Sequence, residues 1–97
     1  MSVNVILELQ SNPEDIDILK TTLEKILPSK RDYDGCIEVH VIENQDDPLN
    51  VILIETWETR EQYEKYLTWR METGAIDAAG AMLSQAPSIR YYDNLKF

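Results

Sequence analysis

Hydrophobic residues occupy every second position in two short segments, residues 3–10 and 36–43, and residues 51–57 form a run rich in β-branched residues. Between the predicted strands, apolar residues recur at the spacing of an α-helix. Alternation places every second side chain on one face and is typical of a strand, whereas the helical spacing forms one apolar stripe. The pattern predicts strands at residues 3–10, 36–43, 51–57 and 88–93, and helices at residues 12–27, 59–71 and 75–85.

Helix-start and helix-stop residues support the boundaries of the two longer helices. Asn12 stands before Pro13 and two acidic residues, which is typical of a helix that an asparagine caps. Pro28 is expected to end this helix at about residue 27, because proline lacks the backbone N–H of a helix interior. Thr59 and Gln62 have the spacing of a capping box, which predicts that the second helix starts there.

The predicted order of elements is β-α-β-β-α-β, which is the order of the ferredoxin-like fold. In this α+β fold, right-handed crossovers place both helices on one face of a four-stranded antiparallel sheet. The 97 residues form a single domain over residues 1–97, since most domains contain about 50–200 residues. The other face of the sheet is expected to carry no helix.

The third predicted strand is apolar on both of its faces. Val51, Leu53 and Trp57 share one face, and Ile52 and Ile54 share the other. In a strand with one solvent-exposed face, polar and apolar residues should alternate more regularly. The sheet face without helices is therefore expected to be buried against another surface. The simplest cover is the same face of a second copy, and we expect a homodimer that packs through its sheet faces.

Composition and charge limit the classes of partner. The net charge is −9, and the nine basic residues are scattered, so we expect neither nucleic acid nor a membrane surface as partner. A small ligand, neutral or apolar or held by a local arginine, fits this charge better. The single cysteine, Cys36, excludes an intramolecular disulfide and fits a reducing compartment. No signal peptide and no apolar run of about 20 residues is evident, so a cytoplasmic location is expected.

Several familiar kinds of site are missing from the sequence. It contains no serine–histidine–aspartate arrangement, no glycine-rich phosphate loop and no cysteine–histidine cluster. Asp46 and Asp47 precede Pro48 in a predicted hairpin loop, where such residues favour turns by themselves. No metal site is predicted.

Several segments resemble the antibiotic biosynthesis monooxygenase family, and the similarity covers nearly the whole chain. The most specific is Glu55-Thr56-Trp57-Glu58, which leads into the second helix. The others are the first strand, residues 12–14, 35–36 and 46–48, the second helix itself and residues 87–92, where the family has its last strand. The resemblance implies a dimeric α+β barrel made of two ferredoxin-like sheets, with a pocket between the sheet and the helices of each subunit. It also implies enzymes that oxidise phenolic or quinol-like substrates without flavin or metal, alongside haem-degrading members.

In the chemistry that this resemblance implies, the deprotonated substrate itself gives an electron to dioxygen. The protein supplies a base, hydrogen bonds and a dry cavity. Many quinol-oxidising relatives carry histidines in the helix after the Trp-Glu segment, where this chain has Tyr66 and Met71. The histidine expected to ligate haem has no counterpart within residues 72–79. We therefore expect no cofactor.

Two residues are candidates for catalysis. His40 is the only histidine, and its ordinary pKa of about 6.5 suits a general base. Alternatively, it is an edge or interface histidine that is paired with Glu38 or Glu43. Arg70 has the charge to stabilise a phenolate or a peroxide-like anion, although a structural salt bridge is the alternative for this residue and for Arg90.

Six residues are candidates for substrate binding through aromatic contact or hydrogen bonds. For Trp57, the alternative to substrate binding is packing in the core or in the dimer interface. Trp69 lies off the main apolar stripe of its helix, where it forms a pocket wall, contacts a partner or is exposed. At least two of the tyrosines are expected to be ordinary residues at the edge of the core. The candidates are Asn4, Trp57, Tyr63, Tyr66, Trp69 and Arg90.

The sequence thus leads to two hypotheses of different classes. The first is a cofactor-independent monooxygenase that oxidises a small aromatic, phenolic or quinol-like substrate with dioxygen. The second is a non-catalytic dimeric module that binds a small apolar metabolite or has a stress-related accessory role, because one fold commonly carries unrelated functions. An isomerase or cyclase acting on a similar enolisable compound is a third option.

Overall fold

The computed structural model describes residues 2–97 and has the predicted ferredoxin-like topology. All neighbouring strands pair antiparallel in one four-stranded sheet, in the order β2-β3-β1-β4. A short third helix is added before the last strand. The elements are β1 (Val3–Gln10), α1 (Ile16–Arg31), β2 (Cys36–Glu43), β3 (Asn50–Trp57), α2 (Arg60–Glu72), α3 (Ala75–Gly80) and β4 (Ser88–Tyr92).

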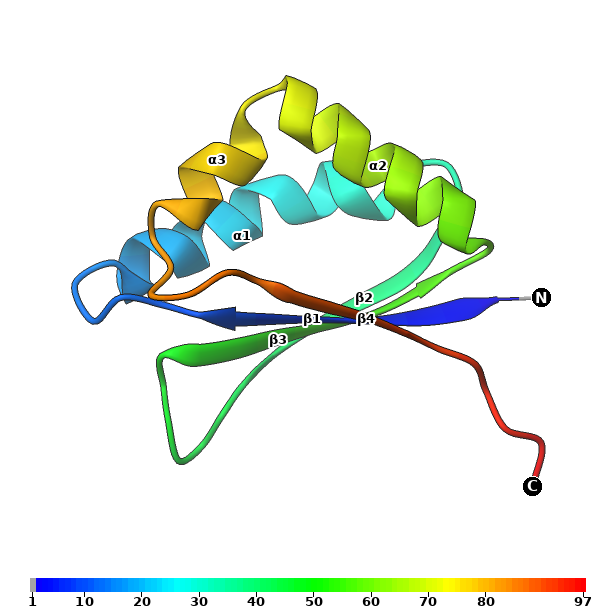
Figure 1. Ribbon diagram of the computed structural model, residues 1–97, viewed down its shortest axis with the longest axis horizontal. Coiled ribbons are helices and arrows are strands. Elements are labelled where there is room, and N and C mark those ends of the chain that lie inside the picture. The colour runs from blue at the N-terminus through cyan, green and yellow to red at the C-terminus, as the bar shows by residue number, and fades with distance from the viewer. Residues whose placement is uncertain (1) are drawn as a thin grey trace.

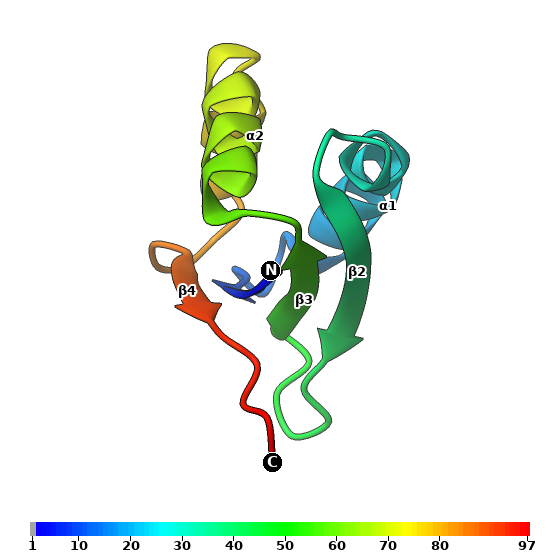
Figure 2. The ribbon, with the colours of Figure 1, turned by 90° about the vertical axis from the view of Figure 1, so that its right-hand side faces the viewer.

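The helices form one layer and the sheet forms the other. All three helices lie on the same face of the sheet (Figure 1). Seen from the side, α1 lies over the β2 edge and α2 over the β4 edge, while no helix of the described residues covers the opposite face of the sheet (Figure 2). The chain after β4 extends toward this bare face (Figure 1).

Both predicted ends of α1 are wrong. The helix begins at Ile16 with Asp15 as its N-cap, because residues 13–15 first form a turn in which the Asn12 side-chain amide donates to Asp15 Oδ2 at 3.1 Å. Pro28 lies inside the helix, which continues to Arg31. The turn after the proline is held because Lys30 is buried against the sheet. Residues 29–31, expected in a loop, are therefore helical.

The second helix begins as predicted, and the third is shorter than predicted. The Gln62 backbone N–H donates to Thr59 Oγ1 at 3.1 Å, which confirms the capping box. The α3 helix ends at Gly80 instead of continuing to residue 85. It ends there because the following residues pair with the end of β1: the Ser84 N–H donates to the Gln10 carbonyl at 2.8 Å, and Leu83 bridges to Ser11.

The core between the layers has an aliphatic part and an aromatic part. The aliphatic part contains Leu9, Leu19, Leu23, Val39, Val51 and Leu53. The aromatic part lies under α2, where Trp57 from β3 meets two tyrosines of the helix at centroid distances of 5.3 and 5.4 Å. Its buried members are Val3, Val5, Trp57, Tyr63 and Tyr66, with Tyr33, Trp69 and Tyr91 packed against them.

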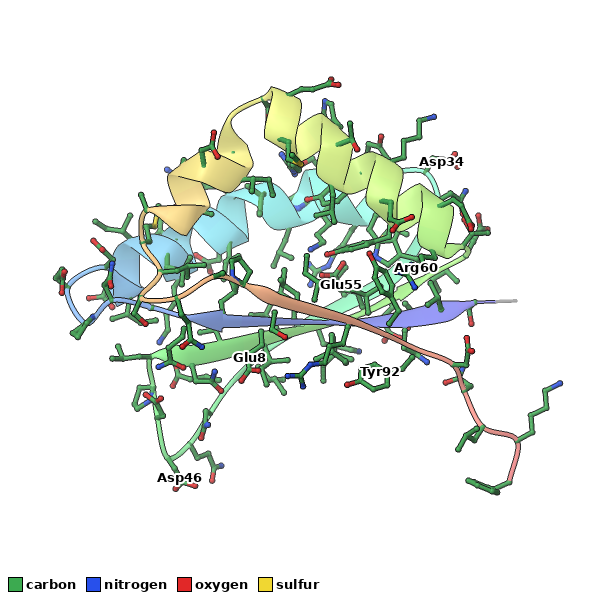
Figure 3. The ribbon with its side chains drawn as sticks, viewed as in Figure 1. Glu8, Asp34, Asp46, Glu55, Arg60 and Tyr92 are labelled. Atoms are coloured by element: carbon green, nitrogen blue, oxygen red, sulfur yellow. The ribbon has the colours of Figure 1, made fainter. Side chains whose placement is uncertain are left out.

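The bare face of the sheet is a strip of isoleucines within a polar border. The strand register places Ile54 between Ile6 and His40, and Ile52 between Glu8 and Ile42. Ile42 is 47% exposed in the single chain. Figure 3 shows Glu8 and Tyr92 on this side and Glu55 on the helix side. The apolar second face of β3 is thus present, as its sequence predicts.

The turn before β2 depends on Gly35. Its φ is +94°, and an added Cβ would lie 2.5 Å from Gln62 Cδ. Gly35→Ala is expected to lower the free energy of unfolding by about 2–3 kcal/mol, from backbone strain plus this clash. Gly74→Ala is the control, since φ is +79° but a Cβ would meet nothing, and about 1 kcal/mol is expected. Urea unfolding measures both, and equal losses would contradict the steric contribution.

Candidate functional site

A cavity of about 210 Å³ lies between the sheet and the helices. Its floor comes from β1 and β4, and its walls come from all three helices. Most of the wall is aliphatic, with Leu7 and Leu9 from β1, Leu23 and Ile26 from α1, and Leu67 and Ile76 from α2 and α3. Four residues bring polar atoms to this lining: Lys30, Tyr63, Tyr66 and Arg70. The cavity can therefore hold a small apolar ligand that has polar groups at one end.

Arg70 is held in the wall by neutral partners. Tyr63, Tyr66 and Arg70 are three and four residues apart on α2, so they share one face of the helix. The Arg70 Nε donates to the Tyr66 hydroxyl at 2.8 Å, and Nη2 donates to Ser29 Oγ at 2.6 Å and the Ile26 carbonyl at 3.2 Å. Within residues 2–97, Arg70 forms no salt bridge. Its charge is therefore available to an anionic group in the cavity.

Lys30 forms a buried ion pair with a strand residue. Its Nζ lies 2.6 Å from Glu55 Oε2, and the Trp57 indole N–H donates to the other oxygen, Oε1, at 2.9 Å. The two charged side chains are 3% and 0% exposed. Burial lowers the pKa of the Lys30 ammonium, and the attraction of Glu55 opposes this shift. Figure 3 shows Glu55 directed from the sheet toward the helices.

The sequence reasoning missed this pair. It assigned Lys30 to a loop, because Pro28 was expected to end the helix. It also named Val51, Leu53 and Trp57 as one buried face and passed over the residue that alternates with them at position 55. An acid in that position is a signal of a buried partner, because an unpaired charge is rarely buried.

The two cavity tyrosines are hydrogen-bonding phenols and not bases. Tyr63 is fully buried, and its hydroxyl has no hydrogen-bond partner among the described residues. Burial raises the pKa of Tyr63 far above its ordinary value. Burial also raises the pKa of Tyr66, although the hydrogen bond from Arg70 opposes the shift. Both phenols stay protonated at neutral pH and can donate to a ligand oxygen.

The structure brings only part of the predicted site together. Arg70, Tyr63 and Tyr66 line the cavity. Trp57 is fully buried beneath them, and Trp69 is half-buried and stacks on Tyr33 at 5.4 Å outside the cavity wall. These two indoles therefore support the site through packing.

Three predicted site residues lie on the bare face of the sheet, away from the cavity. His40 alternates with the buried Val39, and its Nε2 lies 2.6 Å from Glu38 Oε1. Asn4 donates to Asn94 Oδ1 at 2.8 Å. Arg90 is opposite Ile6 in the register. The sheet separates these side chains from the cavity, so they do not join its polar groups.

Other kinds of site are not evident in the described part of the chain. No group of three or more histidine, cysteine, aspartate or glutamate side chains within residues 2–97 is placed to hold a metal ion. Cys36 is a free thiol whose pKa is raised by burial, which makes it less reactive. No helix in this range is long and apolar enough to cross a bilayer.

The fold and cavity define a ferredoxin-like α+β domain with a pocket between its helices and its sheet. The sequence model of the antibiotic biosynthesis monooxygenase family matches residues 2–69. The chain therefore belongs to the antibiotic biosynthesis monooxygenase family. A comparison with curated proteins gives no match.

Several solved structures share the fold over almost the whole chain. A crystal structure of an antibiotic biosynthesis monooxygenase has a TM-score of 0.87 at 21% identity and covers 97% of this chain and 99% of its own. A protein from Deinococcus radiodurans has a TM-score of 0.85 at 24% identity, covering 98% and 94%. A conserved protein from Methanosarcina mazei Go1 has a TM-score of 0.86 at 15% identity, covering 95% and 91%. At these identities the likeness shows the fold alone.

Replacing Tyr63 tests the unpartnered hydroxyl. Tyr63→Phe is expected to raise the free energy of unfolding by about 1 kcal/mol at neutral pH, because it removes a buried polar atom without a partner. The advantage should grow by up to about 1.4 kcal/mol per pH unit above pH 10, because only the unfolded wild-type chain then ionises Tyr63. Urea unfolding at several pH values measures this difference. A less stable variant at neutral pH would contradict the assignment.

Proposed function

We propose that the protein is a monooxygenase that works without flavin, haem or metal and oxidises a small aromatic, phenolic or quinol-like molecule with dioxygen. The observation that carries this proposal is the cavity, with its aliphatic wall and its few polar side chains. A cavity of about 150 Å³ holds benzene. The volume of about 210 Å³ therefore suits a substituted aromatic ring. The free thiol of Cys36 is consistent with action in the cytoplasm.

The polar side chains of the cavity match the oxygen atoms of such a ligand. Tyr63 and Tyr66 offer phenolic hydrogens, and Arg70 offers a charge that no carboxylate within residues 2–97 pairs with. A phenolate oxygen placed beside Arg70 would be stabilised, because a charge–charge interaction is strong in a site from which water is excluded. The aliphatic wall would hold the ring and keep water from the reacting atoms.

The proposed reaction balances without a cofactor. A hydroquinone and one molecule of dioxygen give a hydroxyquinone and one molecule of water. One oxygen atom enters the ring, the other leaves as water, and the substrate supplies all the electrons. The protein has to bind the ring, remove the phenolic proton and stabilise the anion that reacts with dioxygen. Arg70 and Tyr66 are the residues we assign to the last of these roles.

One observation favours a second candidate function. The cavity lining contains no histidine, and the positions that carry histidines in many quinol-oxidising relatives are Tyr66 and Met71 here. The same cavity would serve a non-catalytic module that binds a small apolar or aromatic metabolite. This module would bind the ring in the same place without consuming oxygen.

Oxygen uptake with a panel of hydroquinones and anthrones tests the proposed activity. Arg70→Met is expected to lower kcat/KM about 100-fold, because it removes the charge that faces the developing anion. Lys65→Met is the control, since it removes a cation from an exposed position of the same helix. No oxygen uptake above the uncatalysed rate, with binding of the same compounds retained, would contradict the monooxygenase and favour the binding module.

We also propose that two copies pack through their bare sheet faces. The support is the strip formed by Ile6, Ile42, Ile52 and Ile54, which no helix covers. Burying these side chains against an identical strip would remove their remaining apolar surface from water.

Charge placed in the isoleucine strip tests the dimer. Ile54→Lys is expected to weaken self-association at least about 100-fold, because two like charges would meet in an apolar interface. Ile18→Lys, at a position that is 57% exposed on α1, should leave association unchanged. Sedimentation velocity at low micromolar concentration measures both variants. A wild-type protein that sediments as a monomer would contradict the proposal.

A further inference from the structure

The proposed reaction needs a proton acceptor, and the cavity has no histidine to provide it. The phenols of Tyr63 and Tyr66 are unsuitable, since they remain protonated at neutral pH. His40 is on the other side of the sheet. Within residues 2–97, Lys30 is the only one of the polar residues lining the cavity that is bonded to a carboxylate.

We infer that the Lys30–Glu55 pair is the proton acceptor of the cavity, with Lys30 contacting the phenolic oxygen and Glu55 taking the proton. This inference rests on the proposed function, because it takes the ligand to be a phenol. Lys30 is part of the cavity wall, and Glu55 is bonded behind it at 2.6 Å. A proton that leaves the cavity toward the carboxylate would pass through the Lys30 amine.

The Lys30 ammonium has unused hydrogen-bonding capacity. It carries three N–H donors, and among the described residues only Glu55 accepts one of them. Its nitrogen lies 5.4 Å from the centroid of the Tyr66 ring, whose hydroxyl accepts a hydrogen bond from Arg70. A buried ammonium with free donors next to a cavity is suited to an oxygen ligand, because an unmet buried donor is costly.

The proton transfer is balanced within the pair. Lys30 gives one proton to Glu55 Oε2 and takes the phenolic proton from the ligand, so the ligand O–H bond breaks and a Glu55 O–H bond forms. Lys30 remains an ammonium between the new phenolate and the neutral carboxyl group. No net proton enters or leaves the protein. The phenolate then faces two cations, Lys30 and Arg70. The negative charge of Glu55, which balanced Lys30 before the transfer, is neutralised.

The groups around the pair favour this transfer. Burial lowers the pKa of the Lys30 ammonium, which eases the release of its proton to Glu55. Arg70 lowers this pKa further, whereas Glu55 and the Cys36 thiol oppose the shift. The other titratable neighbours are the phenols of Tyr63 and Tyr66, which are neutral at neutral pH. The indole of Trp57 donates to Glu55 Oε1 and leaves Oε2 as the oxygen that faces Lys30.

A coloured phenol allows the proton to be counted without turnover. The probe is 4-nitrophenol, which is neutral and pale at a pH about one unit below its own pKa and yellow when ionised. Titrating the full-length protein with it under these conditions shows by absorbance whether the bound probe is a phenolate. Calorimetry in two buffers of different ionisation enthalpy counts the protons released. Infrared difference spectra detect a newly protonated carboxyl group.

The wild-type protein is expected to bind the probe as phenolate, with release of close to zero protons and a new carboxylic-acid band. In Glu55→Gln the carboxylic-acid band should be absent. In the double variant Lys30→Met/Glu55→Gln, formation of the phenolate should release about one proton per bound probe, because neither member of the pair is left to take it. In the same double variant, which leaves no unpaired buried charge, affinity for the phenolate should fall at least about tenfold.

Glu58→Gln is the matched control, because it removes an exposed acid close to the same strand, and it should release as few protons as the wild type. Near-ultraviolet circular dichroism verifies that the aromatic cluster is intact in each variant. Release of about one proton by the wild type would overturn the inference, because the solvent would then be the acceptor. Binding of the neutral probe by the wild type would also overturn it, as would no binding at all.

The inference and the proposed function fail separately. The wild-type protein could transfer the probe's proton to Glu55 and yet take up no oxygen with any hydroquinone. That result would support the assignment of the proton acceptor and contradict the proposed monooxygenase activity. Conversely, the protein could take up oxygen with hydroquinones but release the probe's proton to solvent. That result would support the monooxygenase activity and contradict the role of the Lys30–Glu55 pair.

Discussion

The buried ion pair between Lys30 and Glu55 is the interaction on which the arrangement of this protein depends. It joins the last turn of α1 to the C-terminal part of β3, and both charged side chains are almost completely buried. Desolvation makes such a pair costly, and an apolar pair of similar volume is often as stable. Its position beside the cavity, together with the unused donors of Lys30, therefore argues for a role beyond stability. The same contact explains why α1 continues past Pro28.

The aromatic cluster under α2 gives the second cation of the cavity a fixed position. Tyr66 accepts a hydrogen bond from Arg70, and the Arg70 guanidinium carbon lies 4.5 Å from the centroid of the Trp69 ring. Trp69 in turn stacks on Tyr33. Because these rings are held by the core, the guanidinium is placed before any ligand arrives, and no reorganisation is needed when negative charge develops. The core of the fold and the polar part of the cavity thus share the same side chains.

The sequence predicts the fold well because the fold depends on local patterns. The strand at residues 3–10 and the capping box at Thr59 need only alternation and spacing. The site is harder to predict, because it depends on contacts between distant elements. Alternation identifies the face on which His40 lies, but the cavity is defined by the helices that cover the opposite face. Lys30 and Glu55 are 25 residues apart, and their contact requires both the extra turn of α1 and the register of β3.

The charge of the whole chain gives a further reason for an acceptor inside the cavity. At a net charge of −9, the protein repels anions at a distance, so a phenolate formed in solution approaches less readily than the neutral phenol. The cavity has the opposite local balance, because Lys30 and Arg70 both line it and the only carboxylate bonded to either of them within residues 2–97 is that of Glu55, behind Lys30. A neutral phenol can therefore enter without repulsion and become ionised where two cations stabilise it. If the phenol enters in its neutral form and is ionised only inside the cavity, the proton acceptor must itself be buried. Glu55 is buried, whereas His40 is exposed.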